Sequence, residues 1–334
     1  MELSIIFVNW NSVNWLRACI PSLQEYTQGI DYEIIVVDNA SPEGGVDTLK
    51  DEFPDIVLIK SKENLGFAGA NNLGFRESKG DCVLFLNPDT KLVNPAINFM
   101  LQGLRSLPSA GIVGCKLLNG DGSVQTSSIM KFPGILNQIF QYEGLRLRWP
   151  SFPLGDIGPL FSASKEPVRV EAITGACMMM RREVFEKVGL FSEEYFMYAE
   201  DVDLCWKVTR AGFPNYYLGE GNIIHYGGVS SPREWQIVAK VKAELKLCEN
   251  FHGHFYALLF RGALALNAVI RYFLAGALYL FRRACGKKGA PTTALSKYRA
   301  ALKTLLAPSG TSHQPPNARG NSDLPLVKKE RIAH

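Results

Sequence analysis

Short apolar runs alternate with amphipathic stretches over the first 115 residues of the chain. Four stretches have the apolar, β-branched character of buried strands, namely residues 3–8, "YEIIVVDNAS", residues 56–60 and "DCVLFLNPD". A helical pattern covers residues 13–26, and "GFAGANNLGFRESKG" predicts a second helix that Gly80 closes. Near-continuous apolar strands joined by helices are typical of a parallel sheet with helices on both faces.

Polar residues come directly after three of these strands. In open parallel sheets, ligands bind beyond the carboxyl ends of the strands, so these residues are the first candidates for a site. They are Asn9, Asn11, Asp38, Asn39, Asn87 and Asp89.

The pattern weakens in the middle of the chain and then returns. Residues 116–171 are rich in Gly, Pro and aromatic residues, which predicts long loops and short strands. "VEAITGACMMMRREVFEKVGLFSEEYFMYAEDVDLCWKVTRAGF" predicts a strand, a helix, a loop and a second helix that ends at Gly212. A strand-like stretch then leads to "IIHYGG".

Residues 255–281 form an apolar stretch that Arg261, Asn267 and Arg271 interrupt. Its longest uncharged run, residues 272–281, is shorter than the roughly 20 residues that span a bilayer. With Arg282 and Arg283, these polar residues fall within about 160° of one helix face. This pattern predicts a helix that lies in the membrane interface. The alternatives are a kinked re-entrant hairpin and a helix buried against the body, although the sequence shows no partner for the arginines.

The charge of the chain is distributed unevenly. The net charge of +4 comes from residues 286–334, which hold 9 Lys and Arg against 2 Asp and Glu, whereas residues 1–285 hold 27 against 30. A mildly acidic body argues against nucleic-acid binding, and a basic tail suits an anionic membrane surface. Beyond residue 307 the chain is rich in Pro, Ser and Asn, which predicts disorder.

Length and cysteine content place the protein in a broad class. A chain of 334 residues with 47% apolar residues can form one large domain or two fused layers. Its seven cysteines are scattered and never spaced as CxxC, which favours a reduced, cytosolic environment and argues against a zinc site. The N-terminus enters a strand without a basic region, so we expect no signal peptide.

Asp38 and Asp89 each have a structural alternative to a binding role. Asp38 in "VVDNAS" could accept a hydrogen bond from a ribose hydroxyl, but Asp-Asn-Ser is common turn chemistry and the motif alone favours a turn. In "FLNPDT", Pro88 forces Asn87 into an extended conformation and leads the chain off the sheet. This geometry suits both a ligand-binding Asp89 and a plain turn.

Three carboxylates open the predicted helix in "YAEDVDLCWKVTRAGF". The helix macrodipole favours acidic residues in a first turn, which explains Asp203 without any function. Glu200 and Asp201 diverge by about 100° around the helix, so one of them can face a cleft. An ionised Asp at this position could serve as a general base.

Two further motifs are weak when taken alone. "ENLGFAGANNLGF" is Gly-rich at a helix start, yet it matches neither a Walker A loop nor the dinucleotide fingerprint. Asn71 in its helix is a poor helix former, which indicates either a role for its side chain or close packing on the sheet. His225 in "IIHYGG" follows a strand, and a lone histidine is more often structural than a ligand.

Together the motifs are far more specific. Residues 1–230 resemble the inverting glycosyltransferases of family 2, particularly the rhamnosyltransferase-like branch. The residues that carry the resemblance are "IIFVNWNS", "IIVVDNAS", "NLGFAGANNLG", "FLNPDT", "TGACMMMRREVFEKVGLFSEEYFMYAEDVDLCWK" and "HYGG".

The resemblance implies an A-type glycosyltransferase fold, Rossmann-like with a mainly parallel central sheet. Residues 1–115 would be the nucleotide-sugar-binding half and residues 116–230 the acceptor and catalytic half of the same domain. Residues 231–285 would form amphipathic helices at the membrane interface, and residues 286–334 a basic, partly disordered tail.

The resemblance also implies roles for single residues on the donor side. By position, Asn9, Asn11 and Asp38 would hold the base and ribose of the nucleotide. Asn64 and Asn71 would line the nucleotide pocket.

The implied metal site is weaker than usual in the family. Asp89 and His225 would hold a divalent cation, Mg²⁺ or Mn²⁺. Asn87 stands where the family often has a second Asp, and it would bond to the ribose or to a metal-bound water. Since Mg²⁺ commonly takes one or two carboxylates plus phosphates, we expect weak metal binding that depends on the donor.

On the acceptor side, the resemblance makes Asp201 the catalytic base. Gly175 and Ala176 would lie beside the transferred sugar, and Glu200 and Trp206 near the acceptor.

The implied reaction is inverting transfer of a sugar from a nucleoside diphosphate to a hydroxyl. A dTDP-linked deoxyhexose such as rhamnose is the favoured donor, with UDP-sugars second. The apolar helix favours a lipid-linked saccharide acceptor and peripheral attachment to the cytoplasmic face of the membrane, as in surface polysaccharide assembly. The rival interpretations are a sugar-phosphate nucleotidyltransferase, for which the basic Gly-rich N-terminal loop is missing, and a catalytically silent scaffold.

Overall fold

The computed structural model describes residues 1–140, 143–227, 233–285 and 292–307. The predicted disorder beyond residue 307 lies outside these residues. The first half contains β1 (Leu3–Asn9), α1 (Val13–Tyr26), β2 (Tyr32–Asp38), α2 (Thr48–Glu52), β3 (Val57–Lys60), α3 (Gly66–Arg76) and β4 (Cys82–Leu86). These elements include every strand and helix that the apolar pattern predicts for this part of the chain.

One predicted boundary is wrong. Helix α3 ends at Arg76 and not at Gly80. The reason is Ser78, whose N–H and hydroxyl both donate to the carbonyl of Phe75, at 3.1 and 2.6 Å, and close a turn there.

The second half is richer in short elements. From residue 90 to 170 these are β5 (Thr90–Leu92), α4 (Ala96–Ser106), β6 (Ile112–Leu118), β7 (Ile129–Met130), α5 (Ile135–Phe140), α6 (Glu143–Arg148), the 3₁₀ helix η1 (Gly158–Phe161) and β8 (Val168–Val170). They are followed by β9 (Ala172–Ile173), β10 (Cys177–Arg181), α7 (Arg182–Lys187), α8 (Glu200–Arg210), β11 (Asn215–His225), α9 (Arg233–His252), α10 (His254–Ala284) and α11 (Thr292–Leu306).

A single sheet joins the two halves in the order β3-β2-β1-β4-β10-β6-β11-β5, and β8 pairs with β11. Strands β1 to β4 pair in parallel, as the sequence predicts. Strand β10 differs, because it runs antiparallel between β4 and β6. The predicted fold class, an α/β fold with a mainly parallel central sheet, is confirmed.

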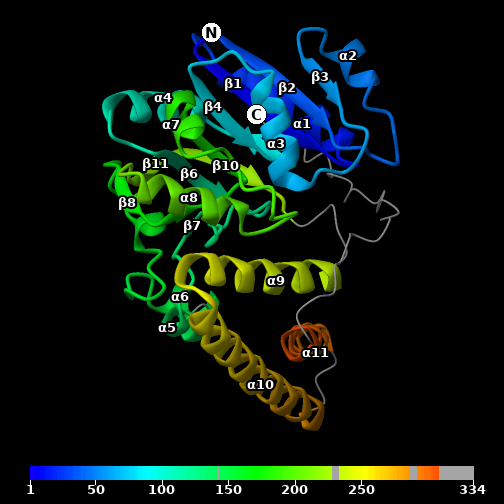
Figure 1. The fold of residues 1–334 in the computed structure, drawn as a ribbon, viewed down its shortest axis with the longest axis vertical. Helices are drawn as coiled ribbons and strands as arrows, with labels where there is room; N and C mark the ends of the chain where they lie inside the picture. Colours follow the sequence, from blue (N-terminus) through cyan, green and yellow to red (C-terminus); the bar gives the residue numbers. More distant parts are fainter. Residues whose placement is uncertain (141–142, 228–232, 286–291, 308–334) are drawn as a thin grey trace, which may run out of the picture.

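Helices cover both faces of this sheet (Figure 1). Apolar residues of α1, α2 and α4 share one core cluster with the strand residues of one face. Apolar residues of α3, α7 and α8 share another cluster with the opposite face. The alternating sides of each strand therefore both lie in hydrophobic cores, which explains the nearly continuous apolar runs.

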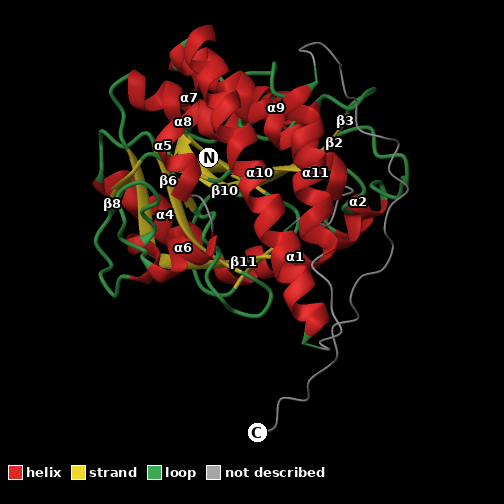
Figure 2. Ribbon diagram, turned by 90° about the horizontal axis from the view of Figure 1, so that it is seen from below, coloured by secondary structure: helices red, strands yellow, loops and turns green. Residues whose placement is uncertain are grey.

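Helix α10 leads away from the sheet, and α11 packs beside it (Figures 1 and 2). Arg261 donates to the carbonyls of Leu305 and Ala307 at the end of α11, and Asn267 donates to the carbonyl of Gln138 in α5 at 3.0 Å. The sequence showed no partner for Arg261, and the structure supplies one from α11 and not from the body. Positive charge at the end of α11 also complements the helix dipole.

The remaining surface of α10 exposes large apolar side chains. They include Phe255, Leu258, Leu266, Phe273, Leu274, Leu280 and Phe281. Residues His254–Phe281 contain an 18-residue window with a mean hydropathy of 1.6 and are long and apolar enough to cross a membrane, by length and composition alone. The helix is continuous, unlike the hairpin alternative, and its placement in the membrane interface stays a prediction.

Gly66 brings the start of α3 against the loop that precedes α8. It has a φ of +72°, and a Cβ built on it would lie 2.2 Å from the carbonyl oxygen of Phe196. The next residue, Phe67, donates its N–H to that same oxygen at 2.9 Å. This close contact fixes the chain just before Glu200 and Asp201.

We expect Gly66→Ala to destabilise the fold far more than Gly189→Ala. Gly189 also has a positive φ, +82°, but nothing lies within 4 Å of its added Cβ, so this control carries only the backbone strain of about 1–2 kcal/mol. Gly66→Ala must also displace the Phe196 carbonyl, so its free energy of unfolding, measured by urea denaturation, should fall by at least about 3 kcal/mol. Equal decreases in the free energy of unfolding of the two variants would contradict this packing.

Candidate active site

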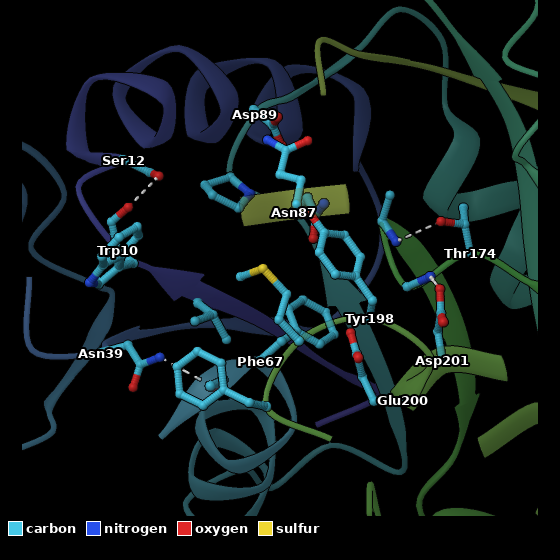
Figure 3. A pocket seen from close by; sticks show the side chains of 18 of the residues that line it. Trp10, Ser12, Asn39, Phe67, Asn87, Asp89, Thr174, Tyr198, Glu200 and Asp201 are labelled. Carbon is cyan, nitrogen blue, oxygen red and sulfur yellow. Dashed lines mark hydrogen bonds between the residues drawn. The ribbon is translucent and has the colours of Figure 1, made fainter. Parts of the chain in front are cut away.

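Three of the polar residues at the strand ends, Asn39, Asn87 and Asp89, line one cavity of about 280 Å³. It lies between the ends of β1 and β4, the starts of α3 and α8, and the first turn of α9. Of the residues predicted from sequence, the cavity is lined by Asn64, Asn87, Asp89, Gly175, Ala176, Glu200, Asp201 and His225. Figure 3 shows Trp10 and Asn39 at one end and Thr174 and Asp201 at the other.

An amide network shapes the end near Trp10. Asn39 accepts the N–H of Leu65 at 2.8 Å and donates to Asn64 Oδ1 at 2.9 Å and to the carbonyl of Gly66 at 3.1 Å. These bonds tie the loop before α3 to the end of β2. The sequence marked Asn39 as a polar residue at a strand end but gave it no role.

Asp38 and Asn9 lie beneath this network and do not line the cavity. The Asn9 amide donates to Asp38 Oδ1 at 2.7 Å and to Ser41 Oγ at 3.1 Å, and its oxygen accepts the N–H of Ser12 at 3.1 Å. Asn9 is completely buried, so its amide positions its neighbours. Asn11 has a φ of +53°, and its buried Nδ2 has no hydrogen-bond partner within the described ranges.

Asn87, Asp89 and His225 converge on one wall of the cavity. His225 Nε2 lies 3.4 Å from Asp89 Oδ1 and 3.3 Å from Asn87 Nδ2. Pairing of β5 with β11, with His225 opposite Thr90, brings these residues together although they are far apart in sequence. A carboxylate, an imidazole and an amide are suitable ligands for Mg²⁺ or Mn²⁺.

Gln125 fixes the tautomer of His225. Its Nε2 donates to the His225 carbonyl at 2.6 Å, so its oxygen faces His225 Nδ1 at 3.0 Å and accepts a hydrogen bond from the Nδ1–H. The lone pair of Nε2 is therefore directed toward Asp89 and Asn87, as a metal ligand requires. Nothing in the sequence indicated Gln125, which lies in the weakly patterned stretch.

The protein supplies only part of a coordination shell. Among residues 1–140, 143–227, 233–285 and 292–307, no three His, Cys, Asp or Glu side chains gather where they could hold a metal ion. A cation at Asp89 and His225 would need further ligands from a bound phosphate and from water.

Asp201 opens α8 with both carboxylate oxygens bound to backbone. Gly175 N–H donates to Oδ2 and Val202 N–H to Oδ1, each at 2.8 Å. The two residues before the helix, Tyr198 and Ala199, have φ values of +72° and +71°. Strained backbone of this kind is typical of functional sites, and here it turns the first carboxylates of α8 into the cavity.

The pKa values of Glu200 and Asp201 are shifted by different surroundings. Burial raises the pKa of Glu200 well above its usual range, and the neighbouring charge of Asp201 raises it further. Burial also raises the pKa of Asp201, but the N–H groups of Gly175 and Val202 oppose this rise. Glu200 Oε2 is buried without a hydrogen-bond partner in the described structure, so Asp201 is the carboxyl that ionises first.

Besides Asn9, Asn11 and Asp38, two more predicted site residues lie outside the cavity lining. Asn71 is buried inside α3, where its amide donates to the carbonyl of Phe67 at 3.0 Å. Trp206 stacks on Phe251 of α9 with a centroid distance of 4.3 Å and contacts Phe132 edge to face. In their place, Trp235 of α9 lines the cavity, and the sequence gave no sign of it.

The family model of glycosyl transferase family 2 matches residues 4–189. This span is more than half of the chain, so the chain belongs to glycosyltransferase family 2 and is a glycosyltransferase by family. The match confirms the identification from the motifs and leaves the nucleotidyltransferase alternative without support.

Several curated proteins are similar in sequence. The chain is 27% identical over 245 residues to an N-acetylglucosaminyl-diphospho-decaprenol L-rhamnosyltransferase of Mycobacterium tuberculosis, which covers 70% of this chain and 78% of that protein. It is 28% identical over 232 residues to the O-antigen biosynthesis protein RfbC of Myxococcus xanthus, covering 69% of this chain. The chain spans only 18% of that protein and 25% of an uncharacterized protein of Sinorhizobium fredii.

Solved structures share the fold at low sequence identity. The mannosyltransferase PcManGT of Pyrobaculum calidifontis, in complex with GDP-Man and Mn²⁺, aligns with a TM-score of 0.57 at 16% identity, covering 91% of this chain and 85% of that one. GalNAc-T7 with UDP, GalNAc and Mn²⁺ aligns with a TM-score of 0.55 at 15% identity, covering 75% and 48%.

We expect Asn87→Asp to strengthen metal binding in the absence of nucleotide. A second carboxylate beside Asp89 adds a charged ligand, so the affinity for Mn²⁺ should rise at least about tenfold, or about 1.4 kcal/mol. Titration of Mn²⁺ by electron paramagnetic resonance measures this change. In the unaltered protein, Mn²⁺ should bind weakly alone and more tightly with dTDP, and tight binding without nucleotide would contradict the one-carboxylate site.

Proposed function

We propose that the protein is an inverting glycosyltransferase that transfers a sugar from a nucleoside diphosphate to a hydroxyl of a lipid-linked saccharide. The observation that carries this proposal is the position of Asp201. Its carboxylate is held by Gly175 at one end of a cavity whose wall carries Asp89 and His225. A proton acceptor and a site for a charged leaving group thus face the same enclosed space.

The chain's own residues account for the chemical step. As the acceptor oxygen attacks the anomeric carbon, Asp201 takes its proton and the bond to the diphosphate breaks, leaving the electron pair on the nucleoside diphosphate. Attack from the side opposite the leaving group inverts the anomeric configuration. A divalent cation at Asp89 and His225 would supply positive charge to the diphosphate.

The donor end of the cavity suits a nucleotide. Asn39 and Asn64 provide amide groups, and Trp10 provides an aromatic surface. Asp38 and Asn9 support these groups from below. We assign residues 1–115 to donor binding and residues 116–230 to the acceptor and to catalysis.

The identity of the donor rests on the relatives. Two of them are named rhamnosyltransferases, from Mycobacterium tuberculosis and Escherichia coli, and both are 27% identical to this chain. We therefore propose a dTDP-linked deoxyhexose such as rhamnose, with a UDP-sugar as the second choice, and a role in the synthesis of surface polysaccharide.

The apolar surface of α10 supports the proposed acceptor and cellular location. Its exposed apolar side chains suit the hydrocarbon of a membrane, while Arg261 and Asn267 bind to the protein. A lipid-linked saccharide held at such a surface would be presented to the adjacent catalytic domain. We propose attachment at the cytoplasmic face, where nucleotide sugars are made.

Asp201→Asn should abolish transfer while donor binding survives. The amide keeps the volume but cannot take a proton, so release of dTDP from dTDP-rhamnose in the presence of membrane lipid extract should fall about 10²–10⁴-fold. Calorimetric binding of dTDP should stay within twofold of the unaltered protein.

Asp203→Asn provides the matched control. Asp203 lies in the same helical turn but bonds to Ser192 and Lys207, so this variant should lose stability and keep transfer. An active Asp201→Asn enzyme would refute the assignment of the base.

The pH profile should show the raised pKa of Asp201. Because burial raises this pKa above the ordinary 3.8, Asp201 holds its proton to a higher pH than a free carboxyl does. Activity should fall as the pH drops through a value above 3.8, measured as kcat/KM for dTDP-rhamnose. Affinity for dTDP, measured at each pH, separates this loss from changes in donor binding. An acid limb at or below 3.8 would contradict the raised pKa.

A further inference from the structure

The first turn of α9 forms part of the cavity wall. Trp235 lines the same cavity as Glu200 and Asp201, and the side chain of Tyr198 lies between these elements, with its ring centroid 6.4 Å from that of Trp235. Helix α9 begins beyond residues 4–189, which the family model matches. This wall is therefore a feature of the C-terminal part of the chain.

Two polar atoms in this wall are buried without hydrogen-bond partners. They are Trp235 Nε1 and Glu200 Oε2, and neither has a partner in the parts of the chain that the structure describes. Glu200 is only 6% exposed. Buried polar atoms nearly always have partners in folded proteins. Both of these side chains line the cavity, so a small side-chain movement on binding would bring the two atoms to a ligand.

The chemistry of the two atoms is complementary to a sugar. The indole N–H is a donor only, and a carboxyl oxygen accepts from a hydroxyl. A pyranose presents hydroxyls that both accept and donate, together with an apolar face that packs against aromatic rings such as those of Trp235 and Tyr198.

The position of Glu200 and Trp235 in the cavity favours binding of the acceptor sugar over binding of the donor sugar. Glu200 is adjacent to Asp201, and Figure 3 shows both at the end of the cavity away from Trp10 and Asn39. A sugar bound to Glu200 and Trp235 would place a hydroxyl near the base. Trp206, the aromatic residue that the sequence suggested for this role, is engaged with Phe251 instead.

We propose that Trp235 is an acceptor-binding residue, whose indole N–H donates to one hydroxyl of the acceptor's terminal sugar while Glu200 Oε2 accepts from another. The inference rests on the proposed glycosyltransferase activity and adds the residues that select its acceptor. Recognition by two polar atoms on an aromatic wall suits a saccharide and not a simple alcohol.

The test compares Trp235→Phe with Trp149→Phe. The first variant keeps an aromatic ring and deletes the N–H. The second makes the same change at a tryptophan that is 58% exposed and does not line this cavity. The probes are octyl glycosides of N-acetylglucosamine, glucose, galactose and rhamnose, in the presence of dTDP and Mg²⁺, with binding measured by saturation-transfer NMR.

The unaltered protein and Trp149→Phe should bind one of these glycosides equally well. Trp235→Phe should bind it about tenfold more weakly, the effect of one lost hydrogen bond in a buried site. Its affinity for dTDP should be retained, which also shows that the variant is folded. In transfer assays the KM for acceptor should rise and kcat should change less.

Glu200→Leu is an independent second variant. It removes a buried carboxyl oxygen that has no hydrogen-bond partner in the described structure, so the fold should be retained. Glycoside affinity should again fall about tenfold. Unchanged glycoside affinity in either folded variant, or no glycoside binding by the unaltered protein, would overturn the inference. Trp235-dependent glycoside binding without any sugar transfer would support the subsite and would contradict the proposed function instead.

Discussion

The hydrogen bond from the Gly175 N–H to the Asp201 carboxylate, 2.8 Å long, organises the end of the cavity where we propose that catalysis takes place. It joins the loop between β9 and β10 to the start of α8 and holds the charged form of an acid that burial would otherwise neutralise. Little room remains around it, because a Cβ on Gly175 would lie 3.2 Å from Asp201 Cβ and 3.4 Å from the Phe67 ring. This contact accounts for the strained backbone at Tyr198 and Ala199, which brings Asp201 to Gly175.

Much of the fold of residues 1–115 could be predicted from the sequence. Its strands are buried on both faces, so their apolar runs are long and uninterrupted, and the polar residues after them mark the sheet edge where a ligand binds. Asn64, Asn87 and Asp89 line the cavity for this reason. The antiparallel course of β10 was not predictable, since an apolar run such as that of residues 177–181 carries no information on strand direction.

Contacts between distant segments account for what the sequence did not show. Gln125 reaches His225 only because β11 pairs with β6 and the loop after β6 folds over it. Trp206 and Asn71 lie on helices near the site, but the packing of α9 and the interior of α3 engage them. Likewise, Arg261 looked unpaired until α11 placed its terminal carbonyls beside it. The local sequence places each of these side chains on its helix or loop, but tertiary structure decides which partner it contacts.

If Asp201 is a lone base that faces a leaving group across one cavity, sugar transfer requires a single displacement. The most direct test is the anomeric configuration of the product, read from the one-bond carbon–proton coupling of its transferred sugar by NMR and compared with that of the nucleotide-sugar donor. We expect inversion. Retention of configuration would contradict it, because a retained product needs two displacements or a route that does not use Asp201 as the base.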